Sequence, residues 1–502
     1  MSCLKHLIKL KEVEIKENLF DFLPAEMEYW GIPGFSYGVM KDGKVIAKGG
    51  YGYRDVEKKL PADEKTLYGI ASCSKSFNSC LIAMLVDEGI LDYDKPIREY
   101  IPEFAMYDPF ATRDCTLRDM LTHRTGLAPH EAMWPDPSST KKDLLMRLRY
   151  LKPNAPFRTV TQYNNTIYSA IGAIAEIVTG ESWEDLIRTR IFEPLGMTSS
   201  LLSAHEMYEQ PNHAQGYWNW EDGKGAVPVG PWEMDVAGGA CGVVSNIEDM
   251  FKWLTLHLNE GVYEGKRLVS EKNMREMHHM QAPMHMFPWK FPEVDTDGSY
   301  GMAWFIQHYR GRKFVWHTGE IEGFCTLEGF LPDENIVIML AMNVHKPLNM
   351  PILMTSCYTV FDRLLGDPEV DWASRLHAWN GKYDAFYYHW NVDLFEGKPA
   401  PVPNTKTSHP LSAYTGSFNH PGYGTYRVEE KDGELVLWYK DMPVRMEHWH
   451  YDVFKAHRLK EDTTVLTAPI SYYMDPFTGD IAGFTLQIEP TVEPAVFKRV
   501  DV

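Results

Sequence analysis

The chain has 502 residues, of which 44% are hydrophobic, so it can bury a large core and is long enough for two to four domains. Its formal net charge at pH 7 is −19, and its Lys and Arg residues are scattered without a basic run. This charge pattern argues against nucleic acid and against an anionic membrane surface as partners.

The seven cysteines are odd in number, are mostly flanked by apolar residues and include no Cys-x-x-Cys pair. We therefore expect buried, reduced thiols and no thiolate metal site. The opening stretch, MSCLKHLIKLKEVEIKENLF, is broken repeatedly by charged side chains, unlike a secretory signal. No later segment supplies the roughly 18 apolar residues of a membrane span, so the sequence predicts a soluble cytoplasmic protein with no membrane partner.

The first expected elements are a helix and a hairpin. An amphipathic helix is predicted over residues 13–31, followed by strands over 34–40 and 45–53. The Asp42-Gly43 pair between these strands is a hairpin turn signal because both residue types tolerate a positive φ.

The next segment predicts an extended approach and then a helix. Residues 66–71 are expected to run extended into Ser72, and apolar side chains then recur at three-to-four spacing from Phe77 to Leu85. Gly89 suits the C-cap of this helix. The whole stretch 77–290 is predicted to be mainly helical with long loops. The clearest helices in it span residues 144–151, 167–179, 183–191 and 247–259.

Strand patterns return from residue 301. Residues 313–316, 325–331 and 335–342 predict strands, and residues 350–365 predict a closing helix. Strands at both ends of this region therefore bracket a helical middle. We expect a mixed α+β domain whose sheet pairs its first and last strands.

The remaining chain changes character twice. Residues 366–410 are rich in proline and predict a linker, whereas short strands separated by turn signals follow from residue 411. The strand pattern predicts a small antiparallel barrel or sandwich. The expected organisation is one domain over residues 1–365, a linker over 366–410 and a β domain over 411–502.

Ser72 and Lys75 carry the strongest chemical signal in the chain. A spacing of three is close to one helical turn, so both side chains leave one face of the predicted helix. The amine can accept the proton of the hydroxyl, and the helix N-terminus favours the negative charge that develops beside it. The pattern alone is weak evidence, because Ser138 and Lys141 match it as well.

Two further motifs follow in order. Tyr163-Asn164-Asn165 lies in a polar stretch before a predicted helix, and His317-Thr318-Gly319 ends a predicted strand. The first of these is also weak alone, because Tyr217-Trp218-Asn219 has the same Tyr-x-Asn pattern.

Together, the three motifs resemble the serine β-lactamase-like superfamily, nearest the branch of class C β-lactamases, D-aminopeptidases and serine esterases. The resemblance covers roughly residues 15–365 and includes segments 116–127, 192–197, 237–239 and 300–304. It implies an α+β β-lactamase/transpeptidase-like domain, with an antiparallel sheet flanked by helices and a helical subdomain. The chain from Tyr414-Thr415-Gly416-Ser417-Phe418 onward is similar to the lipocalin-like β-barrel domain often appended to such hydrolases.

The resemblance implies an acyl-enzyme mechanism. Ser72 would attack the substrate carbonyl, and either Lys75 or Tyr163 would accept its proton, an alternative that the residues leave open. Tyr163 would then protonate the leaving group and later activate water against the acyl-enzyme. The resemblance implies no metal ion and no organic cofactor.

The other motif residues would bind the substrate. Asn165 offers an amide that could hold the substrate or Lys75. The oxyanion would lie between the backbone N–H groups of Ser72 and Glu320, the residue after Thr318-Gly319.

His317 departs from the pattern of many β-lactamases and penicillin-binding proteins, which carry lysine at this position. Free histidine titrates near ~6.5, so we expect weaker recognition of a substrate carboxylate than a lysine provides. A peptidase, amidase or esterase acting on a small-molecule or short-peptide acyl substrate is therefore favoured. The alternatives are a β-lactamase, an acyltransferase or a sensor that acylates without turnover, and the appended domain could gate the pocket or build a homo-oligomer.

Other patterns are interpreted as structural. Residues 34–38 fit the Gly-x-Ser-x-Gly elbow, but Ser36 would lie within a strand and not at a strand-to-helix turn. The histidines of 278–285 lie among methionines without helical spacing, which favours a loop beside the pocket over a metal site. His130 is a candidate for the substrate side.

Overall fold

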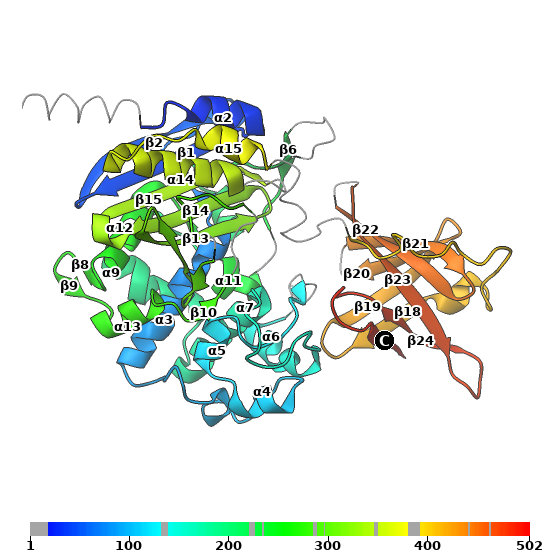
Figure 1. The fold of residues 1–502 in the computed structure, drawn as a ribbon. Coiled ribbons are helices and arrows are strands. Elements are labelled where there is room, and N and C mark those ends of the chain that lie inside the picture. Colours follow the sequence, from blue (N-terminus) through cyan, green and yellow to red (C-terminus); the bar gives the residue numbers. More distant parts are fainter. Residues whose placement is uncertain are drawn as a thin grey trace, which may run out of the picture. The chain divides into compact units, whose positions relative to one another are not determined.

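The computed structural model divides into two compact units, coloured along the chain in Figure 1. The first unit comprises residues 1–95, 116–122 and 168–387, and the second comprises 96–115, 123–167 and 388–502. The structure describes residues 19–131, 139–219, 226–232, 235–284, 289–295, 297–345, 350–379, 392–439, 442–460 and 463–501.

A large antiparallel sheet forms the centre of the first unit. Among the described residues its strand order is β10-β11-β12-β13-β14-β15-β1-β2-β3. The strands are β1 (Gly34–Lys41), β2 (Lys44–Asp55), β3 (Leu60–Pro61), β10 (Ala282–Pro283), β11 (Ser299–Tyr300), β12 (Phe305–Tyr309), β13 (Arg312–Ile321), β14 (Phe324–Leu331) and β15 (Ile336–Met342). Phe35 of β1 lies opposite Met342 of β15, which confirms the predicted pairing of the first and last strands.

Local chemistry explains the β1–β2 hairpin and the burial of the sheet. Asp42 and Gly43 both have positive φ, 51° and 71°, as the predicted turn requires. Every residue of β15 is buried, because both faces of the sheet are covered by helices. One of them, α12 (Ile247–Leu258), packs on β1, where a Cβ at Gly38 would lie 2.2 Å from a methyl carbon of Ile247.

The remaining helices of the first unit follow most of the predicted positions. The helix α14 (Met350–Leu365) has the predicted bounds, whereas the predicted helix over 183–191 is shorter, because α8 (Trp183–Ile187) passes into a π-helical turn over Arg188–Phe192. Of the predicted N-terminal helix, the described part is α2 (Leu23–Trp30), and residues 13–18 lie outside the described residues. The others are α3 (Ser74–Asp87), α5 (Leu117–Leu121), α9 (Glu193–Leu195), α10 (Ala204–Tyr208), α11 (Gly238–Cys241), α13 (Glu271–Met277) and α15 (Trp372–His377).

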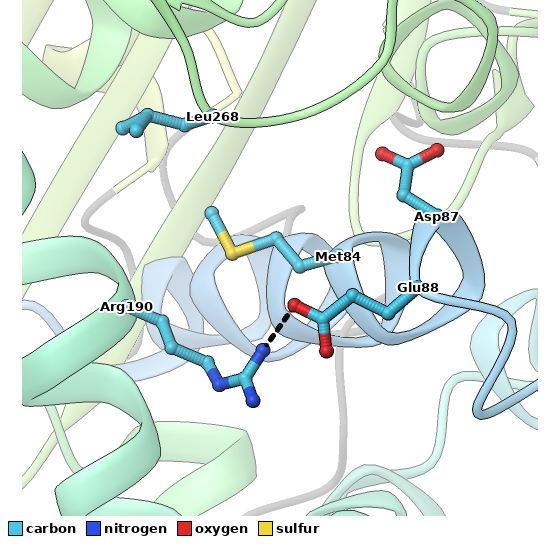
Figure 2. A pocket seen from close by; sticks show the side chains of 5 residues that line it. All are labelled: Met84, Asp87, Glu88, Arg190 and Leu268. Carbon is cyan, nitrogen blue, oxygen red and sulfur yellow. Dashed lines mark hydrogen bonds and ion pairs between the residues drawn. The ribbon is translucent and has the colours of Figure 1, made fainter.

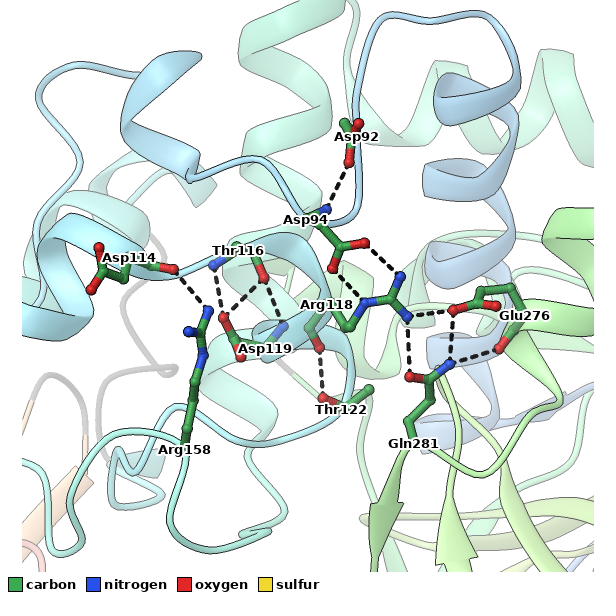
Figure 3. A network of polar contacts seen from close by, with 10 residues as sticks. All are labelled: Asp92, Asp94, Asp114, Thr116, Arg118, Asp119, Thr122, Arg158, Glu276 and Gln281. Atoms are coloured by element: carbon green, nitrogen blue, oxygen red, sulfur yellow. Dashed lines mark hydrogen bonds and ion pairs between the residues drawn. The ribbon is translucent and has the colours of Figure 1, made fainter.

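A polar network anchors α5 within the first unit (Figure 3). The guanidinium of Arg118 donates to both carboxylate oxygens of Asp94, at 2.6 and 2.8 Å, and also to Glu276 and Gln281. Thr116 caps the start of the same helix and exchanges hydrogen bonds with Asp119. The short helix is thereby tied to α13 by charge-assisted bonds.

The second unit contains a closed antiparallel barrel, as the resemblance implied. Among the described residues the strand order is β17-β23-β22-β21-β20-β19-β18-β25-β24, and β23 also pairs with β24, which closes the ring of β18 to β25. The strands are β17 (Val392–Asp393), β18 (Gly416–His420), β19 (Gly424–Lys431), β20 (Glu434–Tyr439), β21 (Met442–His450), β22 (Val453–Lys460), β23 (Thr463–Met474), β24 (Ile481–Leu486) and β25 (Ala495–Val500).

Aromatic side chains fill this barrel. Phe484 lies 4.9 Å from the ring of Phe418 and 5.0 Å from that of Phe497, and all three are fully buried. Outside the barrel, the second unit holds α4 (Pro109–Asp114) and α6 (Lys141–Arg147). The latter begins three residues before the predicted 144–151 helix, because Thr140 and Asp143 form a capping box.

The helix α7 (Asn165–Thr179) begins in the second unit and continues into the first. Within the described part of the chain, no helix is both long and apolar enough to cross a bilayer.

Candidate active site

Ser72 lies in a tight turn between a short strand and a long helix. The chain passes from β4 (Tyr68–Gly69) through a 3₁₀ turn over Ala71–Cys73 into α3. Lys75 lies in the first turn of α3, and its Nζ donates a hydrogen bond to Ser72 Oγ at 2.8 Å. The spacing of three thus brings the hydroxyl and the amine into direct contact.

The turn that presents Ser72 is strained. Ala71 has a φ of 48°, a left-handed conformation that costs a non-glycine residue about 1–2 kcal/mol. The preceding residue is held on both sides, because Ile70 N–H donates to the Val243 carbonyl at 3.0 Å and the Ile70 carbonyl accepts from Thr326 Oγ1 at 3.0 Å. Ser72 itself is half-buried, whereas the residues before and after it in the chain are fully buried.

Lys75 is fully buried, and its amine is surrounded by specific partners. Besides Ser72, Nζ donates to the Ala240 carbonyl at 3.0 Å, and it lies 5.6 Å from the ring centroid of Tyr168. Ala240 belongs to α11, which can approach α3 closely only because Gly239 has no side chain. A Cβ at Gly239 would lie 2.6 Å from Asn78 Nδ2.

The strand β13 runs alongside the Ser72 turn. A Cβ at Gly319 would lie only 1.9 Å from the Ile70 carbonyl oxygen, so only glycine permits this approach. The Cys73 thiol also donates to the His317 carbonyl, at 3.6 Å. The backbone of the His317-Thr318-Gly319 motif is therefore held against the turn that carries the serine.

His317 is neutral and fully engaged within the protein. Its Nδ1–H donates to the Thr318 carbonyl at 2.6 Å, so Nε2 is left to accept from the Tyr300 hydroxyl at 3.0 Å. Burial, together with the nearby Lys75 amine, lowers the pKa of His317 to about 3. This histidine therefore offers no cation to a substrate carboxylate at neutral pH.

Two tyrosines that the sequence motifs do not contain complete this part of the site. The Tyr168 hydroxyl donates to the Leu121 carbonyl at 2.5 Å. Burial raises the pKa of Tyr168, so its phenol stays protonated. The ring of Tyr168 thus lies beside the Lys75 amine, and the hydroxyl of Tyr300 reaches His317. Tyr300 lies in a segment that carried the family resemblance, whereas Tyr168 had no separate signal.

Glu320 follows the His-Thr-Gly motif and brings a carboxylate to this end of β13. Its Oε2 lies 3.9 Å from His345 Nε2, and its Oε1 accepts from the Cys325 thiol at 3.8 Å. Among the described residues, no Lys or Arg lies within 4 Å of this carboxylate, of which 35% is exposed. Desolvation raises the pKa of Glu320, and its partial exposure to water moderates that effect.

Tyr163 and Asn165 belong to the second unit, whereas Ser72, Lys75 and His317-Thr318-Gly319-Glu320 belong to the first. The ring of Tyr163 lies 4.6 Å from that of His123. Asn165 Nδ2 donates to Glu131 Oε1 at 2.8 Å, so its amide is bonded within its own unit.

Asn164, the middle residue of the Tyr-x-Asn motif, anchors the segment. Its Nδ2 donates to the Leu127 and Ala128 carbonyls, both at 2.9 Å, and its Oδ1 caps α7 by accepting from Ile167 N–H at 2.9 Å. An asparagine directly before a helical pattern is an N-cap signal, so this role could have been predicted from the sequence.

The comparisons with known proteins agree with this architecture. The model of the β-lactamase family matches residues 22–352. The chain belongs to the β-lactamase family of serine hydrolases. The model of a domain of unknown function, DUF3471, matches residues 400–499, the region of the barrel.

Among similar proteins, the unguisins hydrolase ungD' of Aspergillus campestris is 26% identical over 440 residues, which is 85% of this chain and 80% of the relative. The protein flp of Staphylococcus aureus is 26% identical over 345 residues, or 66% of this chain and 64% of that protein.

Solved structures share the fold. The octameric penicillin-binding protein homologue from Pyrococcus abyssi has a TM-score of 0.59 at 23% identity, covering 96% of this chain and 99% of its own. The D-amino acid amidase from Ochrobactrum anthropi has a TM-score of 0.58 at 24% identity, covering 70% of this chain and 99% of its own.

The patterns set aside from the sequence have structural partners. Ser36 lies within β1, is fully buried, and donates to the Asp63 carbonyl at 2.7 Å. His278 is hydrogen-bonded to His257 at 2.9 Å inside an aromatic cluster, and His285 lies outside the described residues. His130, a candidate for the substrate side, is instead 2% exposed and bonded to Tyr423 of the second unit.

A surface hollow of about 250 Å³ lies at the far end of α3 from the serine (Figure 2). Because α3 has 14 residues, roughly 20 Å separates its two ends. The hollow is therefore not part of the candidate active site. Its lining residues are Met84, Asp87, Glu88, Arg190 and Leu268.

Proposed function

We propose that this protein hydrolyses amides or esters through an acyl-enzyme on Ser72, as a peptidase, amidase or esterase. The observation that carries the proposal is the 2.8 Å hydrogen bond from Lys75 Nζ to Ser72 Oγ at the start of α3. A buried amine in contact with a half-exposed hydroxyl is the arrangement that an activated serine needs.

In the proposed reaction, Ser72 Oγ attacks the acyl carbonyl and its proton passes to Lys75 or Tyr163. The bond from the carbonyl carbon to the leaving group then breaks, and Tyr163 gives that group a proton. Tyr163 then deprotonates a water molecule, which attacks the ester carbonyl on Ser72. The bond from the carbonyl carbon to Ser72 Oγ breaks, the acid is released, and Tyr163 returns the proton to Oγ. Asn165 binds the substrate or orients Lys75.

The oxyanion is proposed to lie between the backbone N–H groups of Ser72 and Glu320. Two features support this: the Ser72 N–H belongs to the 3₁₀ turn that leads into α3, and Gly319 lets β13 approach the Ser72 turn closely. Thr318 and Gly319 would line the substrate beside this position.

The charges beside Ser72 favour acyl donors without a carboxylate near the scissile bond. His317 is neutral and therefore offers no positive charge to a substrate carboxylate. A neutral amide or ester, including a short peptide, fits this environment better than a penicillin. The name of the unguisins hydrolase also supports a hydrolase activity.

Intact-mass spectrometry after reaction with a fluorophosphonate tests the proposal. The expected result is one adduct that maps to Ser72 and is absent from Ser72→Ala. A wild-type protein that folds but takes no adduct at Ser72 would overturn the proposed function.

Parallel assays separate the rival activities. We expect turnover of D-alanyl amides or p-nitrophenyl esters to exceed that of nitrocefin. Faster nitrocefin hydrolysis would identify a β-lactamase, acyl transfer to an added amine would identify an acyltransferase, and an adduct that persists for hours would identify a sensor. Light scattering in the same buffer tests whether the protein forms a homo-oligomer.

A further inference from the structure

The barrel is hydrogen-bonded to the loop over residues 123–131, and both lie within the second unit. His130 Nε2–H donates to the Lys152 carbonyl at 2.8 Å, so the other ring nitrogen, Nδ1, accepts from the Tyr423 hydroxyl at 2.6 Å. The backbone N–H of His130 donates to Glu489 Oε2 at 3.2 Å. His130 has a φ of 49°, a strained conformation that these contacts maintain.

The loop over residues 123–131 also forms hydrogen bonds with the segment that contains the Tyr163-Asn164-Asn165 motif. Three consecutive carbonyls accept from the motif segment: Leu127 from Gln162 and Asn164, Ala128 from Asn164, and Pro129 from Thr166, all at 2.8–2.9 Å. Residues on both sides of Tyr163 are therefore tied to carbonyls that lie one to three residues before His130.

A second set of hydrogen bonds joins the barrel to Asn154, which lies in the segment that follows the 123–131 loop. Asn154 Nδ2 donates to Thr491 Oγ1 at 3.0 Å, and that hydroxyl donates to Glu489 Oε1 at 2.7 Å. Glu489 is only 8% exposed, so its carboxylate is held between Thr491 and His130. Buried polar groups with satisfied partners fix a geometry more firmly than exposed ones do.

We propose that the barrel is a positioning domain for the reaction. Tyr423 and Glu489 hold His130, and the loop of His130 holds the segment that carries Tyr163. This inference rests on the proposed function, in which Tyr163 transfers protons. Tyr423, Glu489 and His130 are positioning residues, since they act through the loop and not on the substrate.

Tyr163 needs such positioning because it lies on a loop and not within a helix or strand. A proton-transfer group must stay within hydrogen-bond reach of its target, and loops drift unless other contacts restrain them. The barrel supplies this restraint through one phenol and one carboxylate.

The test compares Tyr423→Phe with Tyr473→Phe in the full chain. Tyr473 is a matched control, because its hydroxyl donates to the Phe497 carbonyl at 3.2 Å within the barrel and contacts no residue of the 123–131 loop. We expect Tyr423→Phe to lower kcat about tenfold, the effect of one lost hydrogen bond, with KM changed less than twofold. Tyr473→Phe is expected to change neither.

Two further readouts distinguish positioning from loss of structure. Hydrogen exchange in residues 123–131 and 158–165 should quicken in Tyr423→Phe and not in Tyr473→Phe, whatever the role of Tyr163. In addition, Tyr163→Phe combined with Tyr423→Phe should be no slower than Tyr163→Phe alone, because Tyr423 acts through Tyr163.

Unchanged exchange in the loop would overturn the physical link, and a kcat equal to that of Tyr473→Phe would overturn the positioning role. Multiplicative losses in the double variant would do the same. A wild-type enzyme without a Ser72 adduct would instead reject the proposed function, a result distinct from all of these.

Discussion

The two units support their parts of the proposed site by different physical means. Ser72 and Lys75 lie where α3 meets the large sheet, which has nine strands among the described residues. Gly319 lets the backbone of β13 come directly against the turn that carries Ser72. Tyr163 lies in a loop that is held by polar bonds to another loop and, through that loop, to the barrel. The proposed nucleophile is thus fixed by packing, whereas the proposed acid/base group depends on a chain of hydrogen bonds.

This difference predicts where the molecule tolerates change. A substitution that adds atoms at a packed backbone contact should cause a large loss of stability and activity, because no neighbouring group can move aside. Removal of a single hydrogen bond from a loop should have a smaller effect, because each lost bond costs only about 1 kcal/mol.

The largest effect is expected from Gly319→Val. The new side chain would start 1.9 Å from the Ile70 carbonyl oxygen, so β13 or the Ser72 turn must move. We expect a loss of about 3 kcal/mol or more in the free energy of unfolding and no measurable turnover. Gly230→Ala is the control, since no atom lies within 4 Å of a Cβ at Gly230. Normal turnover in Gly319→Val, measured beside urea unfolding, would show that packing does not fix this part of the site.

The next largest effect is expected from Tyr163→Phe. Removal of a general acid/base group should lower kcat by roughly 10²–10⁴-fold without changing the fold. Tyr150→Phe, an exposed tyrosine of the same unit, serves as the control. A fully active Tyr163→Phe would remove this residue from the mechanism and leave Lys75 as the base.

A smaller effect, on stability, is expected from Glu328→Gln on β14, the strand that pairs with β13. Glu328 lies opposite His317 on β14, and burial raises its pKa to about 8, while Ser76 and Trp253 act in the opposite direction. Its folded-state pKa is therefore above the unfolded value of 4.5, so the folded protein holds an extra proton between these pH values. Wild-type stability should fall as pH rises through this window, by on the order of 5 kcal/mol in total.

The glutamine variant lacks this titration, so its stability relative to the wild type should increase between pH 5 and pH 8.5 in urea unfolding. Glu493→Gln, an exposed carboxylate of the second unit, should show no such trend. A pH-independent difference for Glu328→Gln would mean that this carboxyl is not held neutral by burial.

The smallest effect is expected from Lys152→Ala. Its ion pair with Glu493 joins the barrel to the 123–167 segment at 3.0 Å, but the two side chains are 36% and 85% exposed. Such pairs contribute about 0–1 kcal/mol, so thermal unfolding and kcat should stay close to wild type. A loss as large as that of Tyr423→Phe would mean that exposed contacts hold the barrel in place as firmly as the buried His130 bridge.

The sequence determined those features that depend on residues close together in the chain. The three-residue spacing of Ser72 and Lys75 placed both groups at one helix start, and the Asp42-Gly43 pair predicted the first hairpin. Alternating strands and turn signals predicted the barrel. Local patterns are sufficient in these cases, because backbone periodicity and turn chemistry act over a few residues.

The bounds between the expected domains at 365/366 and 410/411 stay predictions, as does a joint site of Ser72, Lys75 and Tyr163. The division into units differs in kind from these bounds, since the second unit combines the barrel with two segments from the first third of the chain. Continuous stretches of sequence could not suggest that grouping.

Only the tertiary structure decided which distant groups meet. Lys75 bonds to a carbonyl 165 residues away, and His130 to a phenol 293 residues away. The neutral state of His317 likewise depends on burial and on Tyr300 and Lys75, which reach it from other elements. Such contacts arise when the hydrophobic core brings separate elements together, and no local pattern in the chain records them.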